Sequence, residues 1–425
     1  MTLLIFVSSL LGAMAIGVPI AFALMVCGIA LMWHMDMFNA QIVAQNMVTG
    51  ADAFTLLAIP FFLLAGELMN AGGLSRRIID FAMACVGHIK GGLGIVAILA
   101  AVIMASLSGS AAADTAALAS ILIPMMREAN YDVPRSAGLM ASGGIIAPVI
   151  PPSMAFIVFG VAANVSISKL FMAGIAPGLL MGITLVGTWL WLVRKSDIKP
   201  LPKQSMKQRL QATGRGAWAL GMPVIILGGI RMGVVTPTEA AVVAAVYAWL
   251  VGTFVYRELK FRDLYDVFLR SGKTTAVVMF LVAAAMVSAW LITAADIPGE
   301  VTALIEPLID QPRLLMFVIM LLVMIVGTAL DLTPTILIMT PVLMPIVKLA
   351  GIDPVYFGVM FVMNNCIGLL TPPVGVVLNV VSGVARVPLG RVVWGVMPFL
   401  LAYTVLLMLF VVFPELITVP MHWLF

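Results

Sequence analysis

SGGIIAPVIPPS at residues 142–153 and NNCIGLLTPPVG at residues 364–375 decide the fold of this chain. Both stretches lie in apolar surroundings, and each carries a Pro-Pro pair that removes backbone donors and prevents a continuous helix. Pro151-Pro152 recurs as Pro372-Pro373, 221 positions further along the chain. In a membrane chain, helices interrupted at matching places in two halves are typical of a secondary transporter whose site lies at the repeat interface.

The same shift aligns a much longer region without a gap. Moving residues 93–180 forward by 221 positions superposes identical residues at Leu93 and Leu314, Pro124 and Pro345, Asp132 and Asp353, Gly174 and Gly395, and Pro177 and Pro398. The chain therefore contains the same design twice.

The composition indicates a membrane protein. Hydrophobic residues make up 63% of the 425 residues, charged residues make up 10%, and the mean hydropathy is +1.16. No water-soluble core accounts for these values, so we expect an all-α polytopic membrane protein in which residues 2–33 are membrane helices rather than a cleaved signal. Cys27, Cys85 and Cys366 show neither metal-ligand nor disulfide spacing. The formal charge of +4 is spread over several loops, which argues against a nucleic-acid partner.

The charges of the loops assign the two sides of the membrane. Residues 194–215 hold seven Lys or Arg against one acid, and residues 257–273 hold five more. Basic loops stay in the cytoplasm, so both segments belong there, with residues 195–215 as a basic cytoplasmic linker. Residues 34–49 hold no Lys or Arg, and residues 296–310 hold four acids, as expected on the external face.

This assignment gives each half, residues 1–194 and 216–425, five crossings. Residues 2–33 cross twice with a break near Gly17 and Pro19, and residues 228–237 hold the matching break in the second half. Because five is odd, the second half is inverted relative to the first, and both termini lie outside, in the periplasm of a bacterium.

One apolar segment in each half must enter and leave by the same side for this parity to hold. We expect re-entrant hairpins over residues 92–127, opening to the cytoplasm, and over residues 313–349, opening outward. Broken helices follow at residues 136–165 and 354–385. Non-helical backbone at this depth needs protein or water around it, so the hairpin tips indicate a cavity.

Residues 35–48 in the first half and residues 257–270 in the second lie at corresponding places between crossings and are less apolar than the crossings themselves. They are either helices along the membrane interface or ordinary polar loops.

The hairpin tips are rich in small and hydroxyl residues. SLSGSAAAD, residues 106–114, and GTALDLTPT, residues 327–335, combine with the broken helices to offer hydroxyl and freed carbonyl oxygens, which suit a hard cation. In the first half these are the tip hydroxyls of Ser106, Ser108 and Ser110 and the carbonyls near Gly144, Val149 and Pro151. In the second half they belong to Gly327, Thr328, Gly368, Thr371 and Val374. Small residues also allow close helix packing without any ligand, which is the alternative for either tip taken alone.

Two acidic residues lie near the tips. Asp331 stands where the first half has Ser110, which favours a role at the substrate or in proton linkage. Asp114 either acts in the site or caps the helix that follows the tip. Helices that begin after the tips and breaks aim backbone N–H groups at the cavity, a geometry that suits an anionic substrate.

Five segments in order resemble signature segments of one family. They are AIPFFLLAGELM at 58–69, SGSAAAD at 108–114, VIPPS at 149–153, TPTEAAVVAAVYA at 236–248 and LTPPVG at 370–375. The chain is similar over essentially its whole length to the large membrane subunit of TRAP transporters, the tripartite ATP-independent periplasmic transporters.

The resemblance implies an elevator-type transporter of the bacterial inner membrane, driven by Na⁺. It implies two partners, a small four-helix membrane subunit and a periplasmic binding protein that delivers an organic acid anion. On matching positions, one Na⁺ site would involve Ser106, Ser110, Gly144, Val149 and Pro151, and the other Gly327, Gly368, Thr371 and Val374. The substrate would lie near Ser108, Ser153, Asp331 and Asn365.

The substrate itself is not visible in any residue. Likeness to the sialic acid branch puts N-acetylneuraminate ahead of C4-dicarboxylates. A stand-alone Na⁺/carboxylate symporter and an ion channel are the alternatives, since oxygen-lined loops also form selectivity filters. An enzyme is not expected, because HExxH, GxSxG and paired catalytic aspartates are missing and no His lies near the tip serines.

Overall fold

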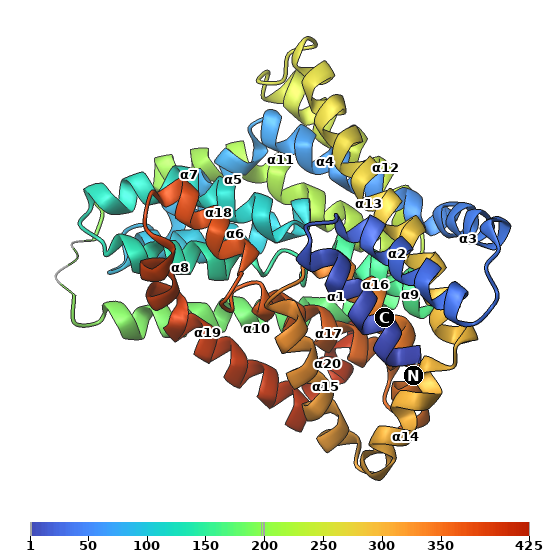
Figure 1. Ribbon diagram of the computed structural model, residues 1–425. Helices are drawn as coiled ribbons and strands as arrows, with labels where there is room; N and C mark the ends of the chain where they lie inside the picture. The colour runs from blue at the N-terminus through green and yellow to red at the C-terminus, as the bar shows by residue number, and fades with distance from the viewer. Residues whose placement is uncertain (1, 197, 199, 425) are drawn as a thin grey trace.

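The computed structural model describes residues 2–196, 198 and 200–424, and in this part of the chain every regular element is a helix (Figure 1). Residues 197 and 199, in the predicted basic linker, lie outside the described residues. The first half contains α1 (Thr2–Ala15), α2 (Ile20–His34), α3 (Ala40–Ala51), the 3-10 helix η1 (Phe54–Leu57), α4 (Ala58–Ala71), α5 (Leu74–Val86), α6 (Gly92–Ser108), α7 (Ala111–Glu128), α8 (Val133–Gly144), α9 (Met154–Ala163) and α10 (Ile167–Val193).

The second half follows with a similar order of helices. It contains α11 (Met206–Arg231), α12 (Pro237–Leu250), the π-helical turn η2 (Val251–Val255), α13 (Asp263–Ala294), α14 (Ile297–Ile309), α15 (Pro312–Gly327), α16 (Leu332–Leu349), α17 (Pro354–Gly368), α18 (Val376–Ala385), α19 (Leu389–Val412) and α20 (Glu415–Leu424).

Six of the described helical segments are long and apolar enough to cross a membrane. They are 54–71, 167–193, 237–255, 263–294, 332–349 and 389–412. Seven further apolar helices are shorter: α1, α2, one arm of each hairpin, the second arm of the first broken helix and both arms of the second broken helix. An all-α polytopic membrane protein is therefore what the structure shows.

The internal repeat is visible in the helix boundaries. Helix α16 begins and ends 221 positions after α7, and α17 begins 221 positions after α8. Where the first half has α3, η1 and α4, the second half has the single helix α13, so residues 263–270 continue directly into an apolar helix. Residues 257–262 are not helical, whereas most of residues 35–48 belongs to α3.

Part of the predicted linker is helical. Ser205 accepts a hydrogen bond from the backbone N–H of Gln208, whose side chain accepts one from the backbone of Ser205, and this capping box starts α11 at Met206. Residues 206–215 therefore belong to α11 rather than to a loop. Helices α5, α14 and α20 were also not predicted as separate elements.

The helices pack in two groups. In the first group, α2 packs against α13, α4 against α12, and α5 against α11. In the second group the halves interlock, because α7 packs against α18, α16 against α9, and α8 against α19. In Figure 1, α7, α8 and α18 of the second group lie at the left, and α2, α3 and α13 of the first group lie at the right.

Candidate functional site

The first tip is a tight turn between α6 and α7. Helix α6 ends at Ser108, Gly109 adopts a left-handed conformation with φ of 62°, and Ser110 caps α7 by accepting a hydrogen bond from the N–H of Ala113 at 3.4 Å. Glycine fits this position because φ is positive. The tip is thus only two residues long, and α7 begins with its N–H groups at the tip.

This tip lies against the first break, between α8 and α9. A Cβ added to Gly109 would lie 3.3 Å from the nitrogen of Met154 and 3.4 Å from the carbonyl oxygen of Pro152. Ser153 is fully buried, and its hydroxyl donates to the carbonyl of Pro148 and accepts from the N–H of Phe156. The Ser153 hydroxyl therefore caps the N-terminus of α9. The substrate contact expected for this residue stays a prediction.

Buried oxygens without partners gather where α7 meets α8. Asp114 is 2% exposed; its Oδ1 accepts from the Ser108 hydroxyl, and its Oδ2 has no hydrogen-bond partner among the described residues. The buried hydroxyl of Thr115 also lacks one there. A Cβ on Gly144 would lie only 1.8 Å from the Thr115 hydroxyl oxygen, so this oxygen fits here only because residue 144 has no side chain.

The second tip contacts the second break through two glycines. A Cβ on Gly368 would lie 2.8 Å from the Cα and carbonyl carbon of Gly327, and a Cβ on Gly327 would lie 2.8 Å from Oδ1 of Asn365. The end of α15 and the end of α17 are therefore in backbone contact. This contact brings together Gly327 and Gly368 of the predicted second ligand set with Asn365, which was predicted at the substrate.

Two buried asparagines in α17 have unpaired oxygens. The side-chain amide of Asn364 donates to the carbonyl of Met320, and that of Asn365 donates to the carbonyl of Leu332 at 3.3 Å. Within the described part of the chain, Oδ1 of each has no hydrogen-bond partner. Both residues are fully buried, so these oxygens need a partner from outside the chain.

Asp331 is exposed and caps α16 by accepting a hydrogen bond from the N–H of Leu332 at 2.8 Å. Ser110 occupies the corresponding cap of α7. The alternative that Asp114 caps α7 is therefore wrong: Asp114 lies in the first helical turn, after the cap, and accepts from the Ser108 hydroxyl rather than from a backbone N–H.

The remaining predicted ligands differ in what their oxygens contact. No hydrogen bond among the described residues ends on the carbonyl of Val149 or Pro151. In contrast, the Ser106 hydroxyl donates to Ile103 at 2.7 Å, the Thr371 hydroxyl donates to Ile367 at 3.0 Å, and the Thr328 hydroxyl donates to Ile325 at 2.8 Å. The Val374 carbonyl accepts from the side chain of Asn379 at 2.8 Å. The Pro151–Pro152 and Pro372–Pro373 peptide bonds are both cis.

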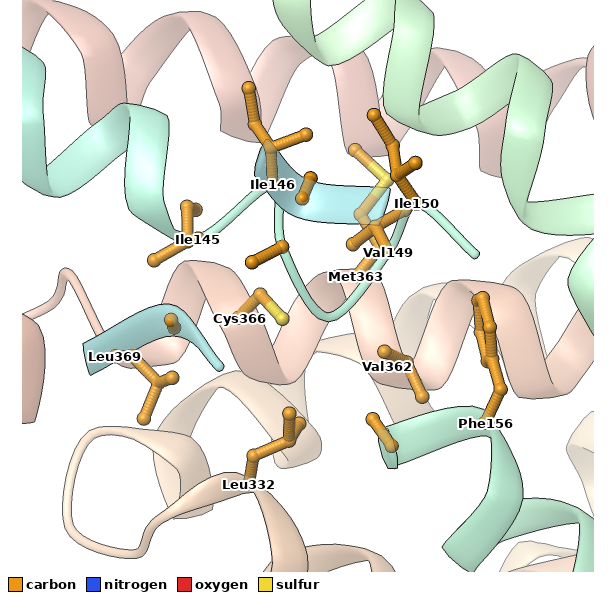
Figure 2. Close-up of a cluster of buried hydrophobic side chains, with 14 of the residues drawn as sticks. Ile145, Ile146, Val149, Ile150, Phe156, Leu332, Val362, Met363, Cys366 and Leu369 are labelled. Atoms are coloured by element: carbon orange, nitrogen blue, oxygen red, sulfur yellow. The ribbon is translucent and has the colours of Figure 1, made fainter. Parts of the chain in front are cut away.

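The first break packs against α17. Figure 2 shows Val149 and Ile150 beside the side chain of Met363 of α17. A further contact, between α19 and α8, was not predicted from the sequence. The buried hydroxyl of Tyr403 in α19 donates a hydrogen bond to the carbonyl of Ser142 in α8 at 2.9 Å.

The two breaks differ in exposure. Residues 143–153 are buried throughout, whereas Pro372, Pro373 and Val374 are exposed, as is Asp331. Helices α13 and α14 pack against α16 of the second hairpin, whereas α5 and α4 pack against α6 of the first hairpin rather than extensively against α7, among the described residues. The two hairpins are therefore covered on different arms.

The sequence profile of the family described as tripartite ATP-independent periplasmic transporter, DctM component, matches residues 7–416. This chain belongs to the DctM family of TRAP transporter permeases. The relatives confirm the resemblance to TRAP large permeases and the expectation that the chain is not an enzyme, since they are named as transporter permeases.

Several relatives of the DctM chain carry different substrate names. The 2,3-diketo-L-gulonate TRAP transporter large permease protein YiaN of Escherichia coli (strain K12) is 60% identical over 424 residues, covering 100% of both chains. The sialic acid TRAP transporter large permease protein SiaM of Vibrio cholerae is 39% identical over 405 residues, covering 95% of both. The YdaH transporter of Alcanivorax borkumensis has a similar fold, with a TM-score of 0.64 at 15% identity over 88% of both chains.

Sequence reasoning missed three residues of this DctM site. The unpaired oxygens of Thr115 and Asn364 and the hydroxyl of Tyr403 were not among the predicted site residues. A signal existed for Asn364, because two adjacent asparagines interrupt an apolar helix. Thr115 carries no such signal, since its place depends on packing against α8.

Proposed function

We propose that this DctM chain imports an organic acid anion together with Na⁺ by moving one helix group past the other. Na⁺ is cargo in this scheme and binds at the two contacts between tip and break. The first site takes oxygens from Ser106, Ser110, Gly144, Val149 and Pro151, and the second from Gly327, Gly368, Thr371 and Val374.

The unpaired oxygens are the observation that carries the proposal. Four of the eight buried side-chain atoms without partners in the described residues are oxygens of Asp114, Thr115, Asn364 and Asn365. Leaving such a group unpaired costs about 1–3 kcal/mol each, and more for a carboxylate. Their position at two equivalent contacts favours cations bound through oxygen, which is the chemistry of a hard ion.

The substrate anion is expected between the tips. Helices α7 and α16 both begin at a tip, so their N-terminal N–H groups and dipoles favour negative charge there. Ser108, Asp331, Asn365 and Ser153 lie at or next to these tips and breaks. An anion neutralised by bound Na⁺ needs no buried arginine in this arrangement.

The packing supports an elevator motion. The cover lies on α6 in the first hairpin, which packs against α5 and α4, and on α16 in the second hairpin, which packs against α13 and α14. Sliding of the second helix group along these contacts would move the cover from one arm of each hairpin to the other.

For the substrate, we now place 2,3-diketo-L-gulonate ahead of N-acetylneuraminate. The relative named for diketogulonate is 60% identical and the one named for sialic acid is 39% identical. The partners proposed are a small four-helix permease and a periplasmic binding protein, in the inner membrane of a bacterium, with both chain termini on the periplasmic face.

Reconstitution tests this function. The chain is inserted in proteoliposomes with the small permease and binding protein from its own source, and uptake of radiolabelled 2,3-diketo-L-gulonate, N-acetylneuraminate and succinate is measured under an inward Na⁺ or K⁺ gradient. We expect uptake of one of them only with Na⁺ and only with the binding protein. Equal rates with K⁺ would contradict Na⁺ coupling, and full uptake without the binding protein would favour the stand-alone symporter. Electrical currents at channel rates would favour the channel.

A further inference from the structure

A cavity of about 540 Å³ lies where the two helix groups meet, between α3 and α13 on one side and α9 and α16 on the other. Its lining is largely apolar, with polar side chains from Asn46, Asn164, Trp290, Thr293 and Lys348. Lys348 is the one charged residue among the described residues that line it. A single cation in an otherwise neutral cavity favours an anionic ligand.

The internal repeat shows that Lys348 departs from its counterpart. Arg127 stands 221 positions earlier, in the last turn of α7, and its guanidinium donates to the carbonyl of Ala385 at the end of α18 at 2.8 Å. Asn164, at the end of α9, is the position equivalent to Ala385. Lys348 is exposed and makes no hydrogen bond or ion pair within the described part of the chain. The cavity therefore lies between Lys348 and Asn164, at the place equivalent to the hydrogen bond between Arg127 and Ala385.

A second donor lines the same cavity. Trp290 is half-buried, and none of the hydrogen bonds between described residues uses its indole N–H. An indole N–H and an ammonium together suit a carboxylate, because both are donors and one carries positive charge. Thr293 adds a hydroxyl at the rim, where it donates to Ala289 and can still accept.

We infer that Lys348 and Trp290 form an outer anion site, which binds the carboxylate of the transported organic acid before the acid reaches the hairpin tips. The inference rests on the proposed function, which supplies the anionic substrate and places this end of α16 outside. The acids within residues 296–310 lie on that same face, so Lys348 counters their repulsion of an anion. Since α16 packs against α13 across the cavity, movement of the helix groups opens a path from this site toward the second tip.

Thiol reagents test the site without knowledge of the substrate. Thr293→Cys is made in a chain whose three native cysteines are replaced by alanine, and membrane-impermeant methanethiosulfonates bearing a sulfonate or a trimethylammonium group are added from outside. We expect the ratio of sulfonate to trimethylammonium rates to fall about threefold when Lys348→Gln is added, because one nearby positive charge is removed. Gln41→Cys, exposed on α3 and outside the cavity lining, is the control whose ratio stays constant. An unchanged ratio at position 293, or no reaction from outside, overturns the site.

Transport kinetics then test the link to uptake. In proteoliposomes containing all three components, radiolabelled 2,3-diketo-L-gulonate is the probe, and Lys348→Gln is expected to raise the apparent KM about tenfold with the maximal rate and the Na⁺ dependence unchanged. Lys348→Arg keeps the charge and is expected to restore a KM near the wild-type value. Arg127→Gln, the matched cation of the first half, is expected to leave the KM unchanged.

The two proposals fail separately. A wild-type KM in Lys348→Gln, or a loss of maximal rate alone, rejects the outer anion site while Na⁺-driven uptake by the wild-type chain still supports the proposed function. If the wild-type chain takes up substrate at equal rates in Na⁺ and K⁺, the Na⁺ coupling is rejected. The anion site is then accepted or rejected by the thiol experiment alone.

Discussion

Asn365 occupies in the second half the position that Gly144 occupies in the first, and the two residues meet equivalent neighbours. A Cβ on Gly144 would lie 2.9 Å from the carbonyl oxygen of Ala111, and the side chain of Asn365 donates to the carbonyl of Leu332, which is the counterpart of Ala111. The Thr115 hydroxyl occupies this place beside Gly144 in the first half, and the side-chain amide of Asn365 occupies it in the second.

This exchange keeps an unpaired oxygen at both contacts. The hydroxyl of Thr115 is the unpaired oxygen beside Gly144, and Oδ1 of Asn365 is the one beside Gly327. Each half therefore presents a buried side-chain oxygen where a hairpin meets a broken helix. The chemistry is retained although the residues differ, which favours a shared ligand over packing.

The hydroxyl of Thr115 provides the first prediction. Thr115→Val keeps the shape and removes the oxygen, so we expect the Na⁺ concentration for half-maximal uptake to rise about tenfold. Thermal unfolding of the purified chain in K⁺ should change little, because this hydroxyl makes no hydrogen bond with the described residues. A clear loss of stability in K⁺ with unchanged Na⁺ dependence would identify Thr115 as a packing residue.

The backbone contact at the second tip provides the next prediction. Gly368→Ala places a methyl group 2.8 Å from the Cα of Gly327, so the tip must move from the break. We expect Na⁺-dependent uptake to be lost and the free energy of unfolding to fall by about 1–3 kcal/mol. Gly383→Ala in α18 is the matched control: nothing lies within 4 Å of its added Cβ, and uptake should persist. Wild-type uptake in Gly368→Ala would show that the close contact is dispensable.

The helix-capping role of Asp331 and its negative charge can be tested separately. Asparagine caps helices as well as aspartate does, whereas alanine removes the cap at a cost of about 1 kcal/mol. We expect both Asp331→Asn and Asp331→Ala to reduce uptake by about tenfold or more, since the negative charge is what the site uses. If Asp331→Asn transports normally and only Asp331→Ala fails, the residue serves the helix rather than the site.

The hydrogen bond between α19 and α8 leads to a prediction about stability. Tyr403→Phe removes the hydroxyl that donates to the carbonyl of Ser142 at 2.9 Å, in a fully buried place. We expect the free energy of unfolding to fall by about 1–2 kcal/mol, measured by thermal denaturation in detergent. Uptake per folded molecule should remain within about twofold of wild type, because the tyrosine touches no proposed ligand oxygen.

The breaks and tips were predictable from the sequence because proline and glycine act locally. The helices end at Gly144 and Gly368, ahead of the two Pro-Pro pairs, and the first tip turns at Gly109. Their matching spacing was visible without any structure. The re-entrant path of the hairpins and the ion ligands remain predictions.

Other features could not be predicted, since they depend on contacts between distant segments. Helices α5 and α14 carry charged residues and lack the apolar length of a membrane crossing, so their sequences resemble loops between crossings. Thr115 becomes a site oxygen only because α8 approaches α7 at Gly144. The exposure of Asp331 likewise depends on how the helix groups pack around it.

Accessibility of the four hairpin ends tests the central claim most directly. Helices α6, α7, α15 and α16 have 16 to 18 residues, about 24–27 Å at 1.5 Å per residue, so length alone does not separate a hairpin from two crossings. Single cysteines at Ile89, Glu128, Arg313 and Leu349 are exposed to an impermeant thiol reagent from either side of the membrane. We expect Ile89→Cys and Glu128→Cys to react only from the cytoplasm, and Arg313→Cys and Leu349→Cys only from the periplasm. Labelling of the two ends of one hairpin from opposite sides would contradict the re-entrant path.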